Sequence, residues 1–237
     1  MAIGDGMAEV FQARYGRSLS VFQNAIDVAV WSGYECRERS PSRAFTVLYA
    51  GHIGHANAGG VRDIAEAVAS LVSEGLAVEL VVYSGDACAA AGTALGSLAG
   101  VRVLPSQPYA TMPKILGDAD LLVLPLDFDR RSIAFARLSM PTKMPEFMAS
   151  GTPTLVYAPA GTALAEDARR LRWGCVVDRQ GVAGLRTAIS RLIDDDGLRA
   201  DLGRTAQHVA QARHDVGVVR PAFRAALLAA AEVSRLG

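Results

Sequence analysis

The fold of this chain is decided by residues 45–83, FTVLYAGHIGHANAGGVRDIAEAVASLVSEGLAVELVVY. Two short runs in this stretch, 45–50 and 78–83, are apolar along almost their whole length. The segment between them, 61–74, places apolar residues at helical spacing. Strands that are apolar throughout, each followed by a helix, are typical of a parallel sheet covered on both faces. The stretch therefore predicts a strand, a helix and a second parallel strand.

The same alternation continues along the chain. Further strands are expected at 101–104, 121–125, 154–157 and 175–177, and further helices at 87–98, 112–117, 142–150, 163–171 and 181–193. The pattern predicts an α/β fold, a doubly wound, Rossmann-like parallel sheet of about six strands with helices on both faces. Outside it we expect a helix at 7–15, a strand at 19–22, a further segment at 24–31, a polar loop at 35–42 and helices at 198–213 and 218–235. Residues 1–237 are expected to form one domain, with an entry segment 1–42, a sheet core 43–195 and C-terminal helices 196–237.

Composition excludes several classes of protein. Lys plus Arg and Asp plus Glu are equal at 24 each, so no overall field favours nucleic acid. Cys36, Cys88 and Cys175 are too widely spaced for a disulfide framework or a metal motif, which indicates a reducing cytoplasm. The sequence shows neither the pattern of a signal peptide nor an apolar run that would span a bilayer. We expect a cytoplasmic protein without a nucleic-acid partner or transmembrane segment; peripheral membrane contact stays open.

Small and polar residues follow the expected strands. Ligands of an open parallel sheet bind outside the carboxyl ends of its strands. Glycines there let the backbone approach a ligand, and helix N-termini attract anions. The residues selected by this rule are Gly51, His52, Gly54 and His55 after the first strand, Ser84 and Gly85 after the second, and Ser106 and Tyr109 after the third. A long loop, 126–140, is expected after the fourth strand.

The most informative segment is SMPTKMPEFMASG, residues 139–151. Pro141 is expected in the first turn of a helix, where its missing N–H is tolerated. Lys143 and Glu146 are three residues apart and therefore share one face of that helix. A lysine at this position suits a phosphate, and the carboxylate can accept both hydroxyls of a ribose. An ordinary surface Lys–Glu pair explains the same spacing, and the pattern alone leaves both interpretations open.

Four stretches, in order, resemble the C-terminal domain of GT-B glycosyltransferases of the family 4 (group 1) type. They are GDGMAEVFQARYG with VFQNAIDVAVW, TVLYAGHIG with VRDIAEAVASL, GVRVLPSQPYATMPKILGDADLLVLPL, and SMPTKMPEFMASGTPTLVY. Each stretch is a weak signal by itself, but the four together at family-like spacing are fairly specific. The resemblance covers nearly the whole chain.

The resemblance implies roles for individual residues. Glu146 matches the second glutamate of the family's E-x7-E motif, which binds the nucleotide ribose. Leu138 stands where the first glutamate would be, as in a branch of the family with a serine–proline–lysine variant, which Ser139, Pro141 and Lys143 match. Thr142 lies between the last two of these residues.

The glycine turn and the base subsite are matched with one departure. Gly51 and Gly54 match the turn beside the diphosphate, and Tyr109 with the backbone of Ser106 lies where the family holds the base. Where the family has an arginine, this chain has His52, and it has no lysine in residues 51–60. His55 and Arg62 are the candidate substitutes.

The resemblance implies a glycosyltransferase that binds a UDP- or GDP-sugar without a metal or other cofactor. Lys143 would stabilise the leaving diphosphate as a catalytic residue, together with Glu146 on the ribose. The acceptor would be held by an N-terminal domain that is absent from this chain, so we expect donor binding without turnover. Polysaccharide biosynthesis is the expected context. The alternative is a non-catalytic nucleotide-binding or partner-binding module of the same ancestry, which the missing arginine–lysine pair favours.

Other features have ordinary explanations. The segment DFD at 127–129 resembles the metal-binding D-x-D of another glycosyltransferase fold, but a solvated acidic loop explains it better. His52 and His55 lack a third metal ligand nearby. Trp31 and Trp173 are expected as packing residues away from the ligand edge. A nicotinamide-binding domain would need a glycine at the position of Tyr49.

Overall fold

The computed structural model describes residues 1–32, 43–85 and 90–236. Six parallel strands form one sheet in the order β3-β2-β1-β4-β5-β6. The strands are β1 (Phe45–Ala50), β2 (Val78–Ser84), β3 (Val101–Pro105), β4 (Leu121–Pro125), β5 (Thr154–Tyr157) and β6 (Gly174–Val177). The prediction of a doubly wound parallel sheet is confirmed, and all six strands lie where the sequence pattern placed them.

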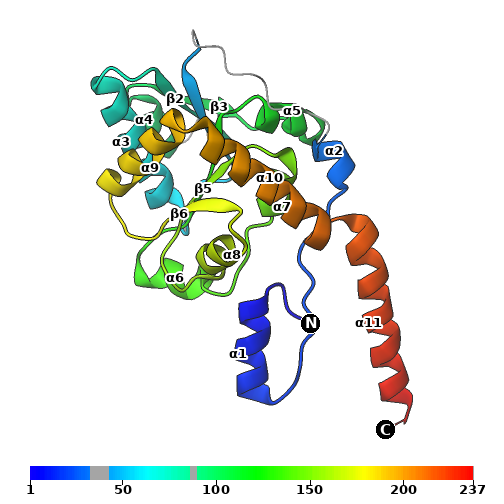
Figure 1. Ribbon diagram of the computed structural model, residues 1–237. Coiled ribbons are helices and arrows are strands. Elements are labelled where there is room, and N and C mark those ends of the chain that lie inside the picture. Colours follow the sequence, from blue (N-terminus) through cyan, green and yellow to red (C-terminus); the bar gives the residue numbers. More distant parts are fainter. Residues whose placement is uncertain (33–42, 86–89, 237) are drawn as a thin grey trace.

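Helices cover both faces of the sheet (Figure 1). They are α1 (Asp5–Tyr15), α2 (Val28–Ser32), α3 (Ala58–Ser73), α4 (Ala90–Gly96), α5 (Met112–Gly117), α6 (Arg130–Ala136), α7 (Met144–Ser150), α8 (Ala163–Leu171), α9 (Val182–Asp194), α10 (Asp196–Arg213) and α11 (Val216–Leu236), with a short 3-10 turn η1 (Tyr109–Thr111) before α5. In Figure 1, α1 and α11 extend below the sheet, where α1 lies next to α8 and α11 continues from the end of α10.

Two apolar clusters, one on each face, explain why the strands are apolar throughout. In β1, Phe45 and Val47 pack against α3 and α9 on one face. Leu48, which points the other way, joins the opposite cluster with residues of α2, α5, α7, α8 and α10. Because successive side chains of a strand alternate between faces, a sheet covered on both sides needs apolar residues at every position. All residues of β1, β4 and β5 are buried accordingly.

The structure corrects three predicted elements. The strand expected at 19–22 does not form; Val21 makes only an isolated bridge to Ala2, because no neighbouring strand lies there to extend the pairing. The loop expected at 126–140 contains α6, whose first turn is capped by the Asp129 carboxylate. The helix expected to begin at Thr142 begins at Met144, so Pro141 precedes it and Pro145 occupies its first turn instead.

The expected polar loop 35–42, Cys36, Asp86, Cys88 and the start of the helix expected at 87–98 lie outside the described residues. In the acidic run at 194–196, Asp195 lies between α9 and α10, and its side chain caps α10 by accepting from the Leu198 amide. None of the helices described in the structure is long and apolar enough to cross a membrane.

The N-terminal segment is fastened to the junction between α10 and α11. The amide of Ile26 donates to the carbonyl of His214 at 2.8 Å, and the amide of Val216 donates to the carbonyl of Ile26 at 2.8 Å. The Nδ1 atom of the buried His214 lies 3.1 Å from the carbonyl oxygen of Asn24. These contacts bring residues 24–26 against α7, where they form one wall of a cavity.

Candidate functional site

The strand order identifies the edge at which a ligand is expected. The chain proceeds from β1 outward to β2 and β3 and then returns to place β4 on the other side of β1. In sheets of this order, ligands bind at the carboxyl ends of the strands, next to the point where the order reverses. The loops after β1 and β4 therefore flank the expected site.

A cavity of about 400 Å³ brings together several of the predicted residues. We call it the α7 cavity; it is lined by Asn24, Ala25, Ile26, Tyr109, Met112, Thr142, Lys143 and Glu146. Tyr109, Thr142, Lys143 and Glu146 were selected from the sequence, whereas Asn24 and Ile26 were not. These two residues lie in VFQNAIDVAVW, one of the stretches that resemble the family, but their place at the cavity depends on contacts with His214 and with the carbonyl of Thr142.

Glu146 and Tyr109 form the centre of the α7 cavity. The hydroxyl of Tyr109 donates to Oε1 of Glu146 at 3.1 Å, and 63% of the Tyr109 side chain is exposed. Oε2 of Glu146 has no partner among the described residues. Burial raises the pKa of Glu146, while the Tyr109 hydrogen bond and the charge of Lys143 oppose that shift. Because Oε1 of this carboxylate is already hydrogen-bonded, Oε2 can accept a hydrogen bond from a hydroxyl of a ligand.

Trp31 supports Tyr109, and no sequence pattern predicts this contact between the two rings. The two rings meet edge to face, with centroids 5.3 Å apart. Trp31 is almost completely buried in α2, and it fixes Tyr109 at the mouth of the α7 cavity. Trp31 is a buried packing residue as expected, but it packs beside the α7 cavity and not away from the ligand edge, because α2 packs against α7. Trp173 is a buried packing residue as expected; its indole N–H donates to Asp167 at 2.9 Å.

Lys143 occupies the N-cap position of α7. Its carbonyl accepts from the amide of Phe147, and Pro145 in the first turn brings no N–H that would need a partner. Glu146 lies in the same first turn, where a negative charge is favoured by the helix dipole. Pro141 is half-buried ahead of the helix, and its carbonyl accepts from the amide of Met144.

The glycine turn after β1 is held by its own side chains. The hydroxyl of Tyr49 donates to the carbonyl of His52 at 2.7 Å, and Asn57 Nδ2 donates to the same carbonyl at 3.1 Å. The amide of Gly54 donates to Oδ1 of Asn57 at 2.8 Å. A Cβ at Gly51 would lie 3.0 Å from the Tyr49 hydroxyl, so the tight turn favours glycine there. The side chains of His52 and His55 are exposed.

The N-terminus of α3 is occupied by a carboxylate of the protein itself. Oδ1 of Asp127 accepts from the amide of Gly60 at 2.6 Å, and the amide of Asp127 donates to the carbonyl of Ala56 at 2.7 Å. A Cβ at Gly59 would come within 3.1 Å of the same oxygen. The sequence predicted a solvated acidic loop here. The structure contradicts this for Asp127, whose carboxylate is bonded to the start of α3. The paired glycines at the start of α3 were the available signal, because they leave room for this approach.

The remaining predicted residues do not line the α7 cavity. Ser84 is buried at the end of β2, whereas Gly85 and Ser106 are exposed on the loops that follow β2 and β3. The segments described in the structure contain no group of three His, Cys, Asp or Glu side chains that could hold a metal ion.

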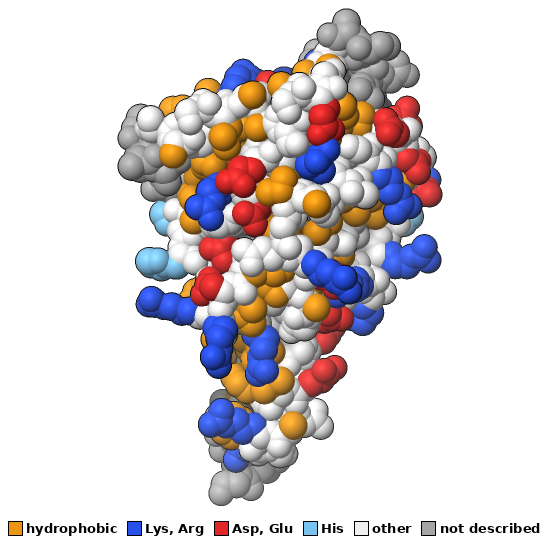
Figure 2. Space-filling view, turned by 90° about the vertical axis from the view of Figure 1, so that its left-hand side faces the viewer, with side chains coloured by type: hydrophobic (Ala, Val, Ile, Leu, Met, Phe, Trp, Pro, Cys, Tyr) orange, Lys and Arg blue, Asp and Glu red, His pale blue; other side chains and the backbone are white. Residues whose placement is uncertain are grey.

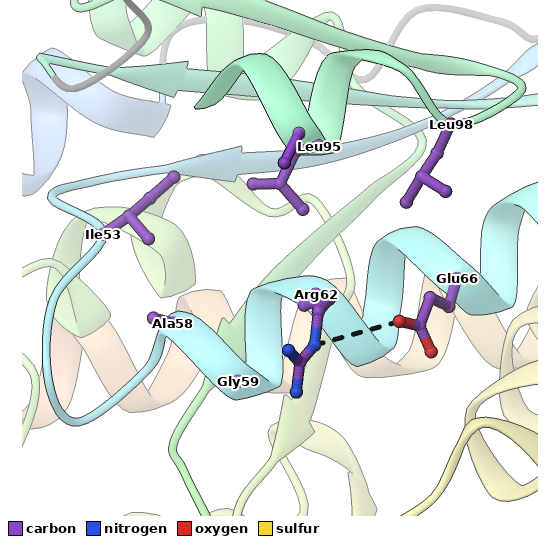
Figure 3. A pocket seen from close by; sticks show the side chains of 8 residues that line it. Ile53, Ala58, Gly59, Arg62, Glu66, Leu95 and Leu98 are labelled. Carbon is purple, nitrogen blue, oxygen red and sulfur yellow. Dashed lines mark ion pairs between the residues drawn. The ribbon is translucent and has the colours of Figure 1, made fainter. Parts of the chain in front are cut away.

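A second cavity, of about 450 Å³, lies between α3 and α4 beside the glycine turn (Figure 3). Ile53, Leu95 and Leu98 make its walls largely apolar. Arg62 lines it from α3, with its guanidinium 3.8 Å from the carboxylate of Glu66. His55 is absent from its lining. Of the two candidate substitutes for the missing lysine, Arg62 therefore faces this second cavity, whereas His55 lines neither this cavity nor the α7 cavity.

The sequence model of the family glycosyl transferases group 1 matches residues 44–195 of this chain. The chain belongs to this family. The match covers the sheet from β1 to the end of α9. A comparison with curated protein sequences finds no match.

Solved structures show the same fold at low sequence identity. The glycosyltransferase-family domain superposes on Anabaena Alr3699/HepE, crystallised with UDP and glucose, with a TM-score of 0.67 and 20% identity over 95% of this chain and 61% of that one. WaaG, a glycosyltransferase involved in lipopolysaccharide biosynthesis, gives a TM-score of 0.62 and 19% identity over 94% of this chain and 60% of that one. The chain thus spans about three fifths of the length of these proteins.

One match is itself a single domain. It is the C-terminal domain of a glycosyl transferase group 1 family protein, LpcC, from Francisella tularensis, with a TM-score of 0.59 and 16% identity. The alignment covers 81% of this chain and 100% of that one. The fold is accordingly that of a GT-B glycosyltransferase domain, as the sequence predicted.

Proposed function

We propose that this domain binds a nucleotide-diphosphate sugar as the donor for glycosyl transfer. The observation that carries the proposal is the arrangement of Glu146, Tyr109 and Lys143 around the α7 cavity. Membership of the glycosyl transferases group 1 family supports it, as does the presence of UDP and glucose in one structural match.

Each of these side chains has a chemical task in the proposal. Tyr109 holds Oε1 of Glu146, so Oε2 is left to accept from a ribose hydroxyl. The ring of Tyr109, braced by Trp31 and largely exposed, offers a face on which a nucleobase can stack. Lys143, at the start of α7, supplies a positive charge for the diphosphate leaving group. No metal is required for this arrangement, which uses protein donors only.

The acceptor and any catalytic base would come from another domain. α11 supports this part of the proposal, because it projects from the sheet domain (Figure 1). Its exposed large apolar side chains are Val218, Phe223, Leu227 and Leu228. Exposed apolar side chains gathered on one helix mark surfaces that pack against a partner. The domain by itself is then expected to bind the donor without transferring the sugar.

A second function is favoured by one observation. The Asp127 carboxylate occupies the N-terminus of α3, where a diphosphate would otherwise find free N–H groups. Together with His52 at the position of the family's arginine, this favours a nucleotide-binding module that does not catalyse transfer. On the face shown in Figure 2, acidic and basic side chains are intermingled over the upper part, whereas basic side chains predominate toward the lower left.

The proposal is tested by calorimetric titration of the purified chain with UDP, GDP, ADP and NAD. We expect tight binding of one nucleoside diphosphate and a loss of about fivefold in Glu146→Gln, because replacing a charge-assisted hydrogen bond by a neutral one costs about 1 kcal/mol. Glu9→Gln is the matched control, since Glu9 is exposed on α1. Binding of NAD alone, or equal loss in both variants, would contradict the proposal. Binding of a nucleoside diphosphate without transfer when an acceptor domain is supplied would favour the second function.

A further inference from the structure

The outer edge of β6 is open. β6 is the last strand of the sheet and pairs only with β5, so its other edge presents backbone N–H and C=O groups to no described strand. A cavity of about 740 Å³ lies along it, with Gly174, Cys175 and Val176 of β6 among the lining residues. Its walls are formed by α8, α9 and α10. We call this cavity the β6 groove.

The walls of the β6 groove are basic. The charged and ionisable residues that line it are Arg169, Arg172, Arg191, Arg204, His208 and Asp201. Asp201 pairs with Arg204, and Arg169 pairs with Glu166 and Asp178. Arg172 and Arg191 are exposed and have no acidic partner among the described residues. In a chain with equal numbers of acidic and basic residues, this leaves a local excess of positive charge beside the unpaired edge of β6.

Arg172 has an unusual backbone conformation for an arginine. It ends α8 with φ 59°, in the left-handed region, and it is the one non-glycine residue with positive φ in the described ranges. Helices that end in this conformation usually have glycine there. Glycine would fit the backbone better, but it would supply no charge to the groove.

We propose that the β6 groove binds an extended acidic segment of a partner protein, which adds a strand to the edge of the sheet. The four residues of β6 span about 13 Å, enough to pair with a short strand. Backbone pairing with the edge supplies affinity, and the flanking arginines select carboxylates. This interaction lies apart from the α7 cavity and does not depend on the proposed donor function.

The test uses fluorescein-labelled hexapeptides in fluorescence-polarisation titrations. The first probe alternates Glu and Val, the second has the same sequence with alternate backbone nitrogens methylated, and the third alternates Lys and Val. We expect only the first to bind, and its affinity to fall as salt is raised. Methylation removes the N–H groups that strand pairing needs.

Two double variants separate the groove from general surface charge. Arg172→Asn with Arg191→Gln should weaken binding by about twofold to thirtyfold, as expected for the loss of two exposed ion pairs. Asparagine tolerates the left-handed conformation at position 172. Arg130→Gln with Arg131→Gln, on exposed residues of α6, removes the same charge elsewhere and should leave binding unchanged.

Hydrogen exchange provides the structural readout. Saturation with the first probe should slow amide exchange within residues 174–177, because new backbone hydrogen bonds form there. Equal binding of the methylated probe, equal weakening in both double variants, or unchanged exchange of these amides would each overturn the proposal. The first two results would indicate attraction of acidic peptides without strand pairing or without the groove.

Discussion

Removing the charge of Asp127 should change stability and phosphate binding in opposite directions. In the folded protein its Oδ1 accepts from the Gly60 amide at 2.6 Å, at the N-terminus of a 16-residue helix. Asp127→Asn keeps an acceptor of the same shape but replaces a charge-assisted bond by a neutral one. That exchange costs about 1 kcal/mol, and loss of the charge–dipole interaction costs a further 0.3–1 kcal/mol or so.

The stability effect should therefore be about 1–2 kcal/mol. For a domain of this size, the midpoint of thermal unfolding should fall by about 2–8 °C. Asp129→Asn is the matched control: Asp129 caps α6 by accepting from the amides of Arg131 and Ser132, and asparagine caps a helix about as well as aspartate, so this change should leave the midpoint nearly unaltered. Both variants are measured by thermal denaturation followed by circular dichroism.

The binding effect should separate the two variants. A phosphate at the N-terminus of α3 would lie roughly 4 Å from the Asp127 carboxylate, and unit charges at that distance repel by about 1 kcal/mol in water. Asp127→Asn should therefore raise the affinity for UDP about fivefold while leaving uridine unchanged, whereas Asp129→Asn should alter neither. The comparison of UDP with uridine isolates the phosphates. An unchanged ratio of the two affinities in Asp127→Asn would refute the reasoning that this carboxylate occupies an anion site.

Three further predictions concern stability. Burial raises the pKa of Glu146 in the folded protein. Its ionisation therefore favours the unfolded chain as pH rises from the ordinary range of a carboxyl group to the higher value in the folded protein. Glu146→Gln should be more stable than the parent at pH 7, with the difference vanishing below about pH 4, as denaturant titrations across this range would show. Burial is the main cause that lowers the pKa of His214, and the charge of Arg213 lowers it further. The hydrogen bond to the Asn24 carbonyl and the charge of Asp167 oppose this shift. The unfolded chain then takes up a proton first, so stability should decline as pH falls below about 6.5, and His214→Gln should lose that part of the decline in the same titrations. A Cβ at Gly203 would lie 2.0 Å from the carbonyl oxygen of Gly151, between α10 and the end of α7. Gly203→Ala should therefore lower the unfolding free energy by about 3 kcal/mol or more. Gly6→Ala in α1, where a Cβ meets nothing within 4 Å, should not lower it in the same measurement.

Local patterns were sufficient for the sheet because its strands are buried on both faces. Every residue of β1, β4 and β5 is buried, so all of them are apolar except Thr46 and Thr154, and such runs stand out in the sequence. Outside the sheet, a strand-like pattern did not produce a strand where no neighbouring strand was present to pair with it. Residues 19–22 look like a strand, but strands are stable only when they pair with neighbours, and none lies beside them beyond the bridge to Ala2.

The candidate site divides in the same way. The sequence by itself placed Lys143 and Glu146 three residues apart at the start of one helix, and the structure has them as its N-cap and a residue of its first turn. Only the tertiary structure decided what surrounds them. Tyr109 reaches Glu146 across 37 positions of sequence, and Asn24 reaches the carbonyl of Thr142 across 118. Asp127 likewise reaches Gly60 across 67 positions. Contacts of this kind follow from the order of strands and the packing of helices, which no local spacing specifies.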